Sequence, residues 1–287
     1  MMDDFQVNSD SLEAVVSALQ RNEIVMEVDE TAGSAVPQAS KLGGDPLLPR
    51  DFAWPVFADT RDGVTRPLSF LCQINLADVK PWDAGGVLPG EGMLYFFYEG
   101  ESFRWGFDPA DRGCARVFYF EDTADFVPTR WPEGIDGMYV VPEMALSFRT
   151  RPSFPSYEEL ECHADVDCDW DDYDALLEEM GADLDAEDHK LLGYADLIQG
   201  EMLTECERVC RGLGCGTPED YRSTPQAVKD SIRAAAKDWT LLLQLSTLEK
   251  DGWEWMWGDC GMLYFYIRKQ DLAAKRFENC WFSLQCG

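Results

Sequence analysis

The sequence predicts an α+β fold of two similar β-rich halves, which arise from an internal duplication and pack about a pseudo-twofold axis with peripheral helices. Three observations predict it. Strand patterns dominate residues 40–150 and return after residue 240. Amphipathic helix patterns lie at the N-terminus and in the second half. The motif Gly-Met-Leu-Tyr-Phe occurs at 92–96 and again at 261–265, and a recurring motif is typical of a repeated unit.

The repeat extends beyond this motif. Gln73 lies 19 residues before its first copy and Gln244 lies 17 residues before its second, each within a leucine-rich strand pattern. Further upstream, Lys41 begins Lys-Leu-Gly-Gly and Lys190 begins the looser match Lys-Leu-Leu-Gly. Chance agreement between strand-forming segments is the alternative to duplication. If the halves are duplicated, the cleft between them is the natural place for a ligand.

The N-terminal segment predicts a helix followed by a strand. Residues 10–22 carry apolar side chains at i, i+3, i+4 and i+7, and Asp10 with Glu13 forms a capping box. Residues 24–28 then favour a short strand. Residues 40–55 are rich in glycine and proline, so we expect an ordered loop there.

The remaining elements alternate between strands and helices. In the first half the patterns predict strands at 68–76, 93–98, 116–120, 138–141 and 145–148. The strand at 93–98 is apolar on both faces and should be central. In the second half they predict helices at 187–192, 201–211 and 225–238, the last with Thr224 as its N-cap. Strands are expected at 240–248 and 262–267.

Four segments follow from these patterns. They are an N-terminal helix and strand (1–39), a first β-rich half (40–150), an acidic insertion (151–188) and a second α+β half (189–287). The 287 residues are 46% hydrophobic, enough for a sizeable core. We expect the segments to form one compact unit.

The charge balance restricts the partners. The chain has 54 acidic and 24 basic side chains, so its formal net charge is −30. Such a chain repels phosphate backbones and anionic lipids, which argues against nucleic-acid or membrane-surface binding and leaves a basic protein or a small molecule as partner. The acidic N-terminus and the absence of a long apolar run predict a cytoplasmic protein, whose ten cysteines should be reduced and mostly buried.

Half of the net charge lies in one segment. Residues 157–188 contain fifteen Asp or Glu and no Lys or Arg, which predicts a solvated, mobile loop that attracts a basic partner. The candidate partner-binding residues are Asp165, Asp167, Asp169, Asp171, Asp172 and Asp174. The spacing of three of these with Glu178 partly matches a calcium-binding EF-hand loop, but Asp172 stands where that loop needs glycine. A solvated loop is therefore favoured over divalent binding, and no metal site is predicted.

A second set of candidates could hold a ligand. Trp253, Trp255 and Trp257 alternate, so in a strand they would form one aromatic face for sugars, peptides or cations, with Asp259 beside it. Burial of the three indoles is the alternative. The repeat-related residues Lys41, Gln73 and Gln244 are further candidates, although the glutamines could instead satisfy backbone groups.

No catalytic signature is found. The only histidines are His163, whose pKa the acidic run should raise, and His189, which favours a structural role. Cys206, Cys210 and Cys215 have poor spacing for zinc, and helical burial explains the first two. Nucleotide-binding glycine motifs are absent. The sequence indicates no cofactor.

Several motifs nevertheless resemble a known family. They are Ser-Lys-Leu-Gly-Gly at 40–44, Phe-Leu-Cys-Gln-Ile-Asn-Leu at 70–76, the two Gly-Met-Leu-Tyr-Phe copies, Leu-Gly-Tyr at 192–194 and Leu-Gln-Cys at 284–286. In order and spacing they resemble the YwqG-like family of bacterial proteins, catalogued as domain of unknown function 1963, across roughly residues 40–287. The resemblance implies no catalytic residues.

These observations favour a non-catalytic binding or interaction module, with an acidic surface for a basic protein, for example as an immunity-type protein that neutralises a basic effector. The alternative is a small-ligand binder or a hydrolase that uses the cleft between the two halves.

Overall fold

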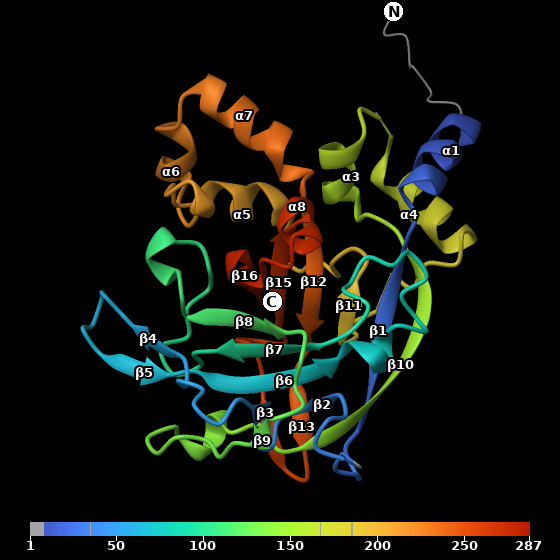
Figure 1. Cartoon of the computed structure of the whole chain (residues 1–287). Helices are drawn as coiled ribbons and strands as arrows, with labels where there is room; N and C mark the ends of the chain where they lie inside the picture. Colours follow the sequence, from blue (N-terminus) through green and yellow to red (C-terminus); the bar gives the residue numbers. More distant parts are fainter. Residues whose placement is uncertain (1–8, 35, 167, 185) are drawn as a thin grey trace, which may run out of the picture.

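The computed structural model describes residues 9–34, 36–166, 168–184 and 186–287, and its main feature is one ten-stranded antiparallel sheet (Figure 1). In spatial order the strands are β16 (Trp281–Gln285), β15 (Met262–Arg268), β12 (Trp239–Leu245), β11 (Lys190–Leu192), β1 (Arg21–Asp29), β10 (Met144–Ser153), β2 (Lys41–Leu42), β6 (Ser69–Asn75), β7 (Met93–Tyr98) and β8 (Ala115–Phe120). The sheet therefore includes strands from the predicted segments 1–39, 40–150 and 189–287.

The centre of the sheet is the pair β1 and β10, which align along the whole of β1. Two arms extend from this pair in the same order. The first arm runs from β10 through β2, β6 and β7 to β8, and the second runs from β1 through β11, β12 and β15 to β16. Each arm begins with a short strand and continues with three longer antiparallel strands. A β-bulge interrupts the pairing of β6 with β7 at Leu71 and that of β12 with β15 at Leu242.

The sheet curls so that the two arms pack against each other. In Figure 1, β6, β7 and β8 cross in front of β12 and β15. The rings of Phe96 in β7 and Phe265 in β15 lie 5.2 Å apart, and those of Tyr98 and Phe282 lie 5.6 Å apart. One hydrophobic core contains residues of both arms. Core side chains thus fill the interior between the arms, and two cavities are lined by residues of both predicted halves.

Helices cover the outside of the sheet in two groups. Near the N-terminus, α1 (Ser9–Leu19), α3 (Tyr157–His163) and α4 (Trp170–Glu179) share a small apolar cluster. Over the second arm lie α5 (Leu203–Cys210), α6 (Pro218–Arg222) and α7 (Gln226–Ala236). The short helices α2 (Leu76–Val79) and α8 (Lys269–Ala273) follow strands directly. Three 3₁₀ turns occupy 109–111, 137–139 and 277–279.

Three small two-stranded sheets complete the strands in the described part of the chain. They are β3 (Leu47–Leu48) with β9 (Val127–Pro128), β4 (Val56–Ala58) with β5 (Thr65–Pro67), and β13 (Leu248–Lys250) with β14 (Trp253–Trp255). The last of these carries two of the three predicted aromatic-face tryptophans. None of the helices in the described ranges is both long and apolar enough to cross a lipid bilayer.

Three secondary-structure predictions are wrong. Residues 187–192 were expected to form a helix, but 190–192 form β11, because β1 and β12 offer backbone partners on both sides. Residues 138–141 form part of a 3₁₀ turn and its exit instead of a strand. Thr224 does not cap α7; Pro225 occupies that position, and the Thr224 hydroxyl donates to the carbonyl of Asp220.

The acidic segment also differs from its prediction. Much of residues 157–188 is helical, because α3 and α4 bury Leu160, Tyr173 and Leu177 against α1. Most of the described carboxylates of this segment are exposed on these helices or in the turns around them, whereas Glu159 of α3 is buried. An acidic composition is therefore compatible with ordered helices where a few apolar residues recur at helical spacing.

Contact between the arms should dominate stability. We expect Phe265→Ala to lower the free energy of unfolding by about 3–5 kcal/mol, because the ring is fully buried against Phe96 and its loss leaves a cavity. Urea unfolding measures this. The control Val56→Ala, at an exposed position, should change it by less than about 0.5 kcal/mol. Equal effects of the two substitutions would contradict the packing described.

Candidate functional site

Two buried lysines form ion pairs at corresponding places in the two arms. Lys41 begins β2, and its Nζ lies 2.6 Å from Oε2 of Glu143. Lys190 begins β11, and its Nζ lies 3.0 Å from Oε2 of Glu23 and 2.5 Å from Oδ1 of Asp196. Both lysine side chains are at most 4% exposed. Since a buried charge is tolerated only with partners, each lysine fixes the carboxylates around it.

Each lysine lies opposite a buried glutamine. Lys41 pairs with Gln73 across the β2–β6 register, and Lys190 pairs with Gln244 across β11–β12. Oε1 of Gln73 accepts from the backbone N–H of Leu47, and Oε1 of Gln244 accepts from that of Asp196, both at 2.9 Å. The amide nitrogens donate to Pro37 and Ala39 in the first arm and to Asp188 and Asp196 in the second. The glutamines therefore satisfy groups of the protein itself.

The two arrangements agree in sequence offset. Leu47 and Asp196 each lie six residues after the lysine of their arm. The residues two and three positions after each lysine have positive φ: Gly43 and Gly44 in the first arm, Leu192 and Gly193 in the second. A Cβ on Gly44 would lie 2.5 Å from Glu143, and one on Gly193 would lie 2.6 Å from Glu23. The glycine three residues after each lysine thus leaves room for the glutamate that binds the lysine.

One difference between the arms has electrostatic consequences. Where the first arm has the buried apolar Leu47, the second has Asp196, whose side chain is 22% exposed. Burial raises the pKa of Asp196 in spite of its ion pair with Lys190. The second arrangement consequently presents a carboxylate to a cavity, and Glu23 lines the same cavity.

Two cavities of about 540 and 470 Å³ adjoin this arrangement, and Glu187 lines both. We call them together the acidic groove. Their lining includes ten carboxylates: Glu23, Glu27, Glu30, Glu158, Asp174, Asp183, Glu187, Asp188, Asp196 and Glu249. Among the lining residues only Arg149 and Arg151 are permanently cationic.

Both arginines are already neutralised. Nε of Arg149 lies 3.0 Å from Oε1 of Glu27. Arg151 binds Glu23 through Nε and lies 2.7 Å from Oδ2 of Asp188 through Nη1. Burial opposes the charge of Arg151, but these carboxylates raise its pKa overall. Within the described residues, Glu158, Asp174 and Glu187 have no ion-pair partner, so the groove keeps an excess of negative charge.

An aromatic pair lies at the larger cavity. Tyr157 begins α3 and Trp170 begins α4, and their ring centroids are 5.0 Å apart. The Trp170 side chain is 47% exposed. An exposed indole beside carboxylates is an arrangement that attracts Lys and Arg side chains, because the ring face and the carboxylates both favour a cation.

Of the predicted acidic residues that the structure describes, Asp174 alone lines this groove. Asp169 caps α4 and accepts from the backbone N–H of Asp171. Asp172 is exposed on the first turn of α4, Asp174 lines the groove, and Asp165 is exposed before the helix. Asp167 lies outside the described residues. The EF-hand spacing falls on a helix instead of a loop, and the described ranges contain no cluster of three or more His, Cys, Asp or Glu suited to a metal.

The predicted aromatic face is largely buried. Trp257 is fully buried and Trp255 is 3% exposed, and both belong to the main core. Nε1 of Trp257 donates to the carbonyl of Ser246 and Nε1 of Trp253 to that of Met138. Asp259 is exposed and lines none of the cavities described here. The burial alternative therefore describes Trp255 and Trp257.

Both histidines have lowered pKa values, and the cysteines are free thiols. Burial lowers the pKa of both His163 and His189 to about 4. The expected rise for His163 is wrong, because burial, reinforced by Arg21 and Lys269, outweighs the acidic run. His189 lines the smaller cavity, and its Nδ1 accepts from the backbone N–H of Ser246. All ten cysteines are free, and Cys206 of α5 and Cys215 are buried in one apolar cluster.

A family model described as a domain of unknown function (DUF1963) matches residues 40–286. The chain belongs to the DUF1963 family. No curated protein matches it. The DUF1963 match begins one residue before Lys41 and includes both lysines, both glutamines and Asp196. It does not include β1, which contributes Glu23 and Glu27 to the acidic groove.

Sequence reasoning missed the central residues of the groove. Glu23, Arg151 and Asp196 come from three separate segments, and no local motif marks the first two. Asp196 carried a usable signal: it lies six residues after Lys190, as Leu47 does after Lys41, so comparison of the repeats would have shown a carboxylate at a buried position.

The two lysines should differ in their effect on stability. We expect Lys190→Met to lower the free energy of unfolding by about 3–5 kcal/mol, because buried carboxylates lose their partner. Lys41→Met should cost only about 1–2 kcal/mol, since Glu143 is one-third exposed and still accepts from Ser34. Urea unfolding of the two variants makes the comparison. A larger loss for Lys41→Met would contradict this description.

His189 should make stability depend on pH. Because its pKa is lowered from 6.5 to about 4 by folding, the unfolded chain binds the proton first as the pH falls through this window, and stability falls. His189→Asn keeps an acceptor for Ser246 but does not titrate. Unfolding measured between pH 7 and 4 should therefore show a smaller loss in the variant. Parallel curves for the two proteins would disprove the assignment.

Proposed function

We propose that this protein is a non-catalytic binding module whose acidic groove receives a basic protein. The observation that carries the proposal is the charge of the groove, where ten carboxylates surround two arginines that are both already paired. Excess charge of one sign in a concave site attracts a cationic partner and raises its association rate.

The shape of the groove supports a protein partner with projecting Lys or Arg side chains. Its two cavities adjoin at Glu187, so neighbouring basic side chains could occupy both at once. The Trp170 indole at the larger cavity offers a face for one of these cations. Buried anchors such as Lys190 hold Glu23 and Asp196 in place before binding, which reduces the entropy lost on association.

We also propose that the two arms arose by duplication of one unit. Supporting observations are the equal strand order, the β-bulges two residues before Gln73 and Gln244, and the equal offsets of the lysine contacts. A further match supports the proposal. The backbone N–H of Asn75, two residues after Gln73, donates to the side chain of Ser40, which precedes Lys41. The backbone N–H of Ser246, two residues after Gln244, donates to the side chain of His189, which precedes Lys190. On this proposal, the carboxylate that Asp196 adds to the acidic groove is specific to the second copy.

Removal of groove charge should weaken cation binding. The groove variant combines Asp174→Asn, Asp183→Asn and Glu187→Gln, and the control combines Asp51→Asn, Asp125→Asn and Glu133→Gln at exposed positions of the first half. Fluorescence anisotropy with a labelled arginine-lysine octapeptide in about 50 mM salt should show at least a tenfold loss of affinity for the groove variant.

The control variant carries the same net charge, so it should lose less than about threefold. Affinity of the unmodified protein should fall steeply as salt is raised to about 500 mM. Equal losses in the two variants would mean that total charge, and not the groove, attracts the peptide, and would overturn the proposal.

A further inference from the structure

A third cavity, of about 460 Å³, lies on another part of the rim and shares no lining residue with the acidic groove. One side consists of first-half residues: Arg61, Phe103, Arg104, Trp105, Phe107, Asp108, Pro109 and Asp111. The other side consists of Gly214, Gly216, Thr217 and Asp220 of the second half. The volume is within the range of small-molecule sites, roughly 300–1,000 Å³. We call this cavity the junction cleft.

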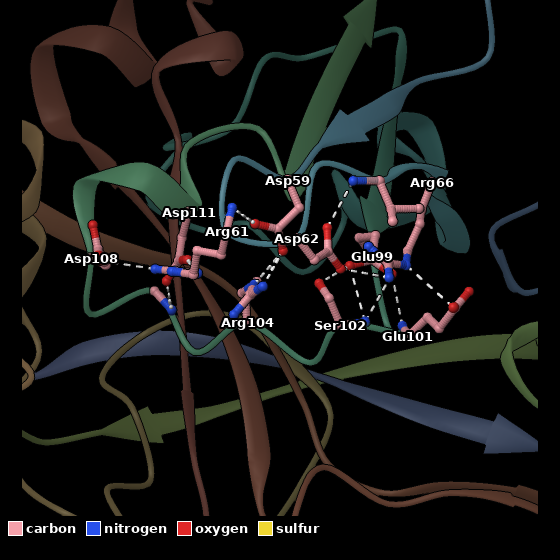
Figure 2. A network of polar contacts seen from close by, with 12 residues as sticks. Asp59, Arg61, Asp62, Arg66, Glu99, Glu101, Ser102, Arg104, Asp108 and Asp111 are labelled. Atoms are coloured by element: carbon pink, nitrogen blue, oxygen red, sulfur yellow. Dashed lines mark hydrogen bonds and ion pairs between the residues drawn. The ribbon is translucent and has the colours of Figure 1, made fainter.

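A network of ion pairs fixes the polar wall of the junction cleft (Figure 2). Arg104 binds the buried carboxylate of Asp59. Arg61 lies between two carboxylates, with Nη2 3.0 Å from Asp108 and Nη1 2.5 Å from Asp111. The guanidinium groups are thereby held in place and matched in charge, and the side chains of Arg61 and Arg104 remain 33% and 21% exposed.

Three aromatic side chains, at every second position of residues 103–107, line the same cleft. Phe103, Trp105 and Phe107 are half-buried, and successive ring centroids lie 6.1 and 6.2 Å apart. Their segment is bonded to the second half, because the carbonyl of Trp105 accepts from Leu284 and that of Phe107 accepts from Cys215. The aromatic wall is therefore immobilised by backbone contacts.

The loop before this wall is strained but strongly held. Phe103 has φ +53°, a left-handed conformation that a bulky residue adopts only at a cost of roughly 1–3 kcal/mol. The buried carboxylate of Glu99 accepts from the backbone N–H groups of Glu101 and Ser102, and the Tyr98 hydroxyl donates to the carbonyl of Arg104 (Figure 2 labels Glu99, Ser102 and Arg104). Strain that the surroundings maintain in this way is often found at ligand sites.

The chemistry of the cleft selects the class of ligand. Fixed aromatic faces bind flat apolar surfaces, while the arginines and the carboxylates of Asp108 and Asp220 offer donors and acceptors at the edge. Because every arginine is matched by a carboxylate, the cleft does not favour a bare anion. A ring with an apolar C–H face and several hydroxyl groups meets both requirements. We propose that the junction cleft binds a neutral sugar, at a site separate from the acidic groove.

Gly216 provides a way to block the cleft. It has no positive φ, and a Cβ there would lie 3.7 Å from Cβ of Phe107, an ordinary contact. Gly216→Leu should therefore fill the cleft without backbone strain. Gly137→Leu is the matched control, because Gly137 also lacks a positive φ and a Cβ there would meet nothing within 4 Å. Trp105→Phe is a second cleft variant that keeps a ring in the aromatic wall.

The experiment is isothermal titration of the whole protein with glucose, galactose, mannose, N-acetylglucosamine, maltose and cellobiose, each to about 20 mM. We expect at least one to bind with one-to-one stoichiometry. Its affinity should fall at least about tenfold in Gly216→Leu and about threefold or more in Trp105→Phe, and by less than about twofold in Gly137→Leu.

Three outcomes would overturn the proposal. One is that none of these sugars binds. Another is that binding is unchanged in both cleft variants, which would place the sugar elsewhere. The third is that inorganic phosphate or glucose 6-phosphate binds in preference to glucose, because the arginines would then recognise an anion. Thermal unfolding of each variant checks that it is folded before titration.

Discussion

The antiparallel pairing of β1 with β10 is the constraint on which the rest of the structure depends. Each arm of the sheet is attached to one of these two strands, through β11 on one side and β2 on the other. The short strands have few backbone bonds of their own, so their lysines contribute to fixing the register by binding glutamates beside the central pair. Curling of the sheet around this centre then brings the aromatic residues of the two arms together.

The same lysine-centred arrangement supports different surroundings in the two arms. In the first arm, Lys41 binds Glu143, and the position that corresponds to Asp196 is the buried residue Leu47. In the second, the extra carboxylate adjoins a cavity bounded by the acidic helices. The difference between Leu47 and Asp196 therefore adds one carboxylate to the lining of the acidic groove.

The sequence predicted the local features well and the spatial ones poorly. The repeated Gly-Met-Leu-Tyr-Phe motif correctly located β7 and β15, because strands buried on both faces need apolar residues on both faces. The expected central position of the strand at 93–98 is wrong, since β7 lies next to the edge strand β8. The strand at 190–192 was missed, since three residues become a strand only when partners lie on both sides. The acidic groove is lined by β1, β10 and the acidic helices α3 and α4. No local sequence pattern predicts that these elements lie side by side. The alternating tryptophans do not form an exposed aromatic face, because Trp255 and Trp257 pack into the main core.

The position of β1 outside the DUF1963 match has a practical consequence. A fragment cut at residue 40 would lack the central strand, so β10 and β11 would each present a row of unpaired backbone N–H and C=O groups in the middle of the sheet. Such open edges recruit strands from other molecules. The matched region alone would therefore be prone to aggregate or to exchange strands between copies. In the whole chain, β1 covers both edges and so protects the protein from self-association.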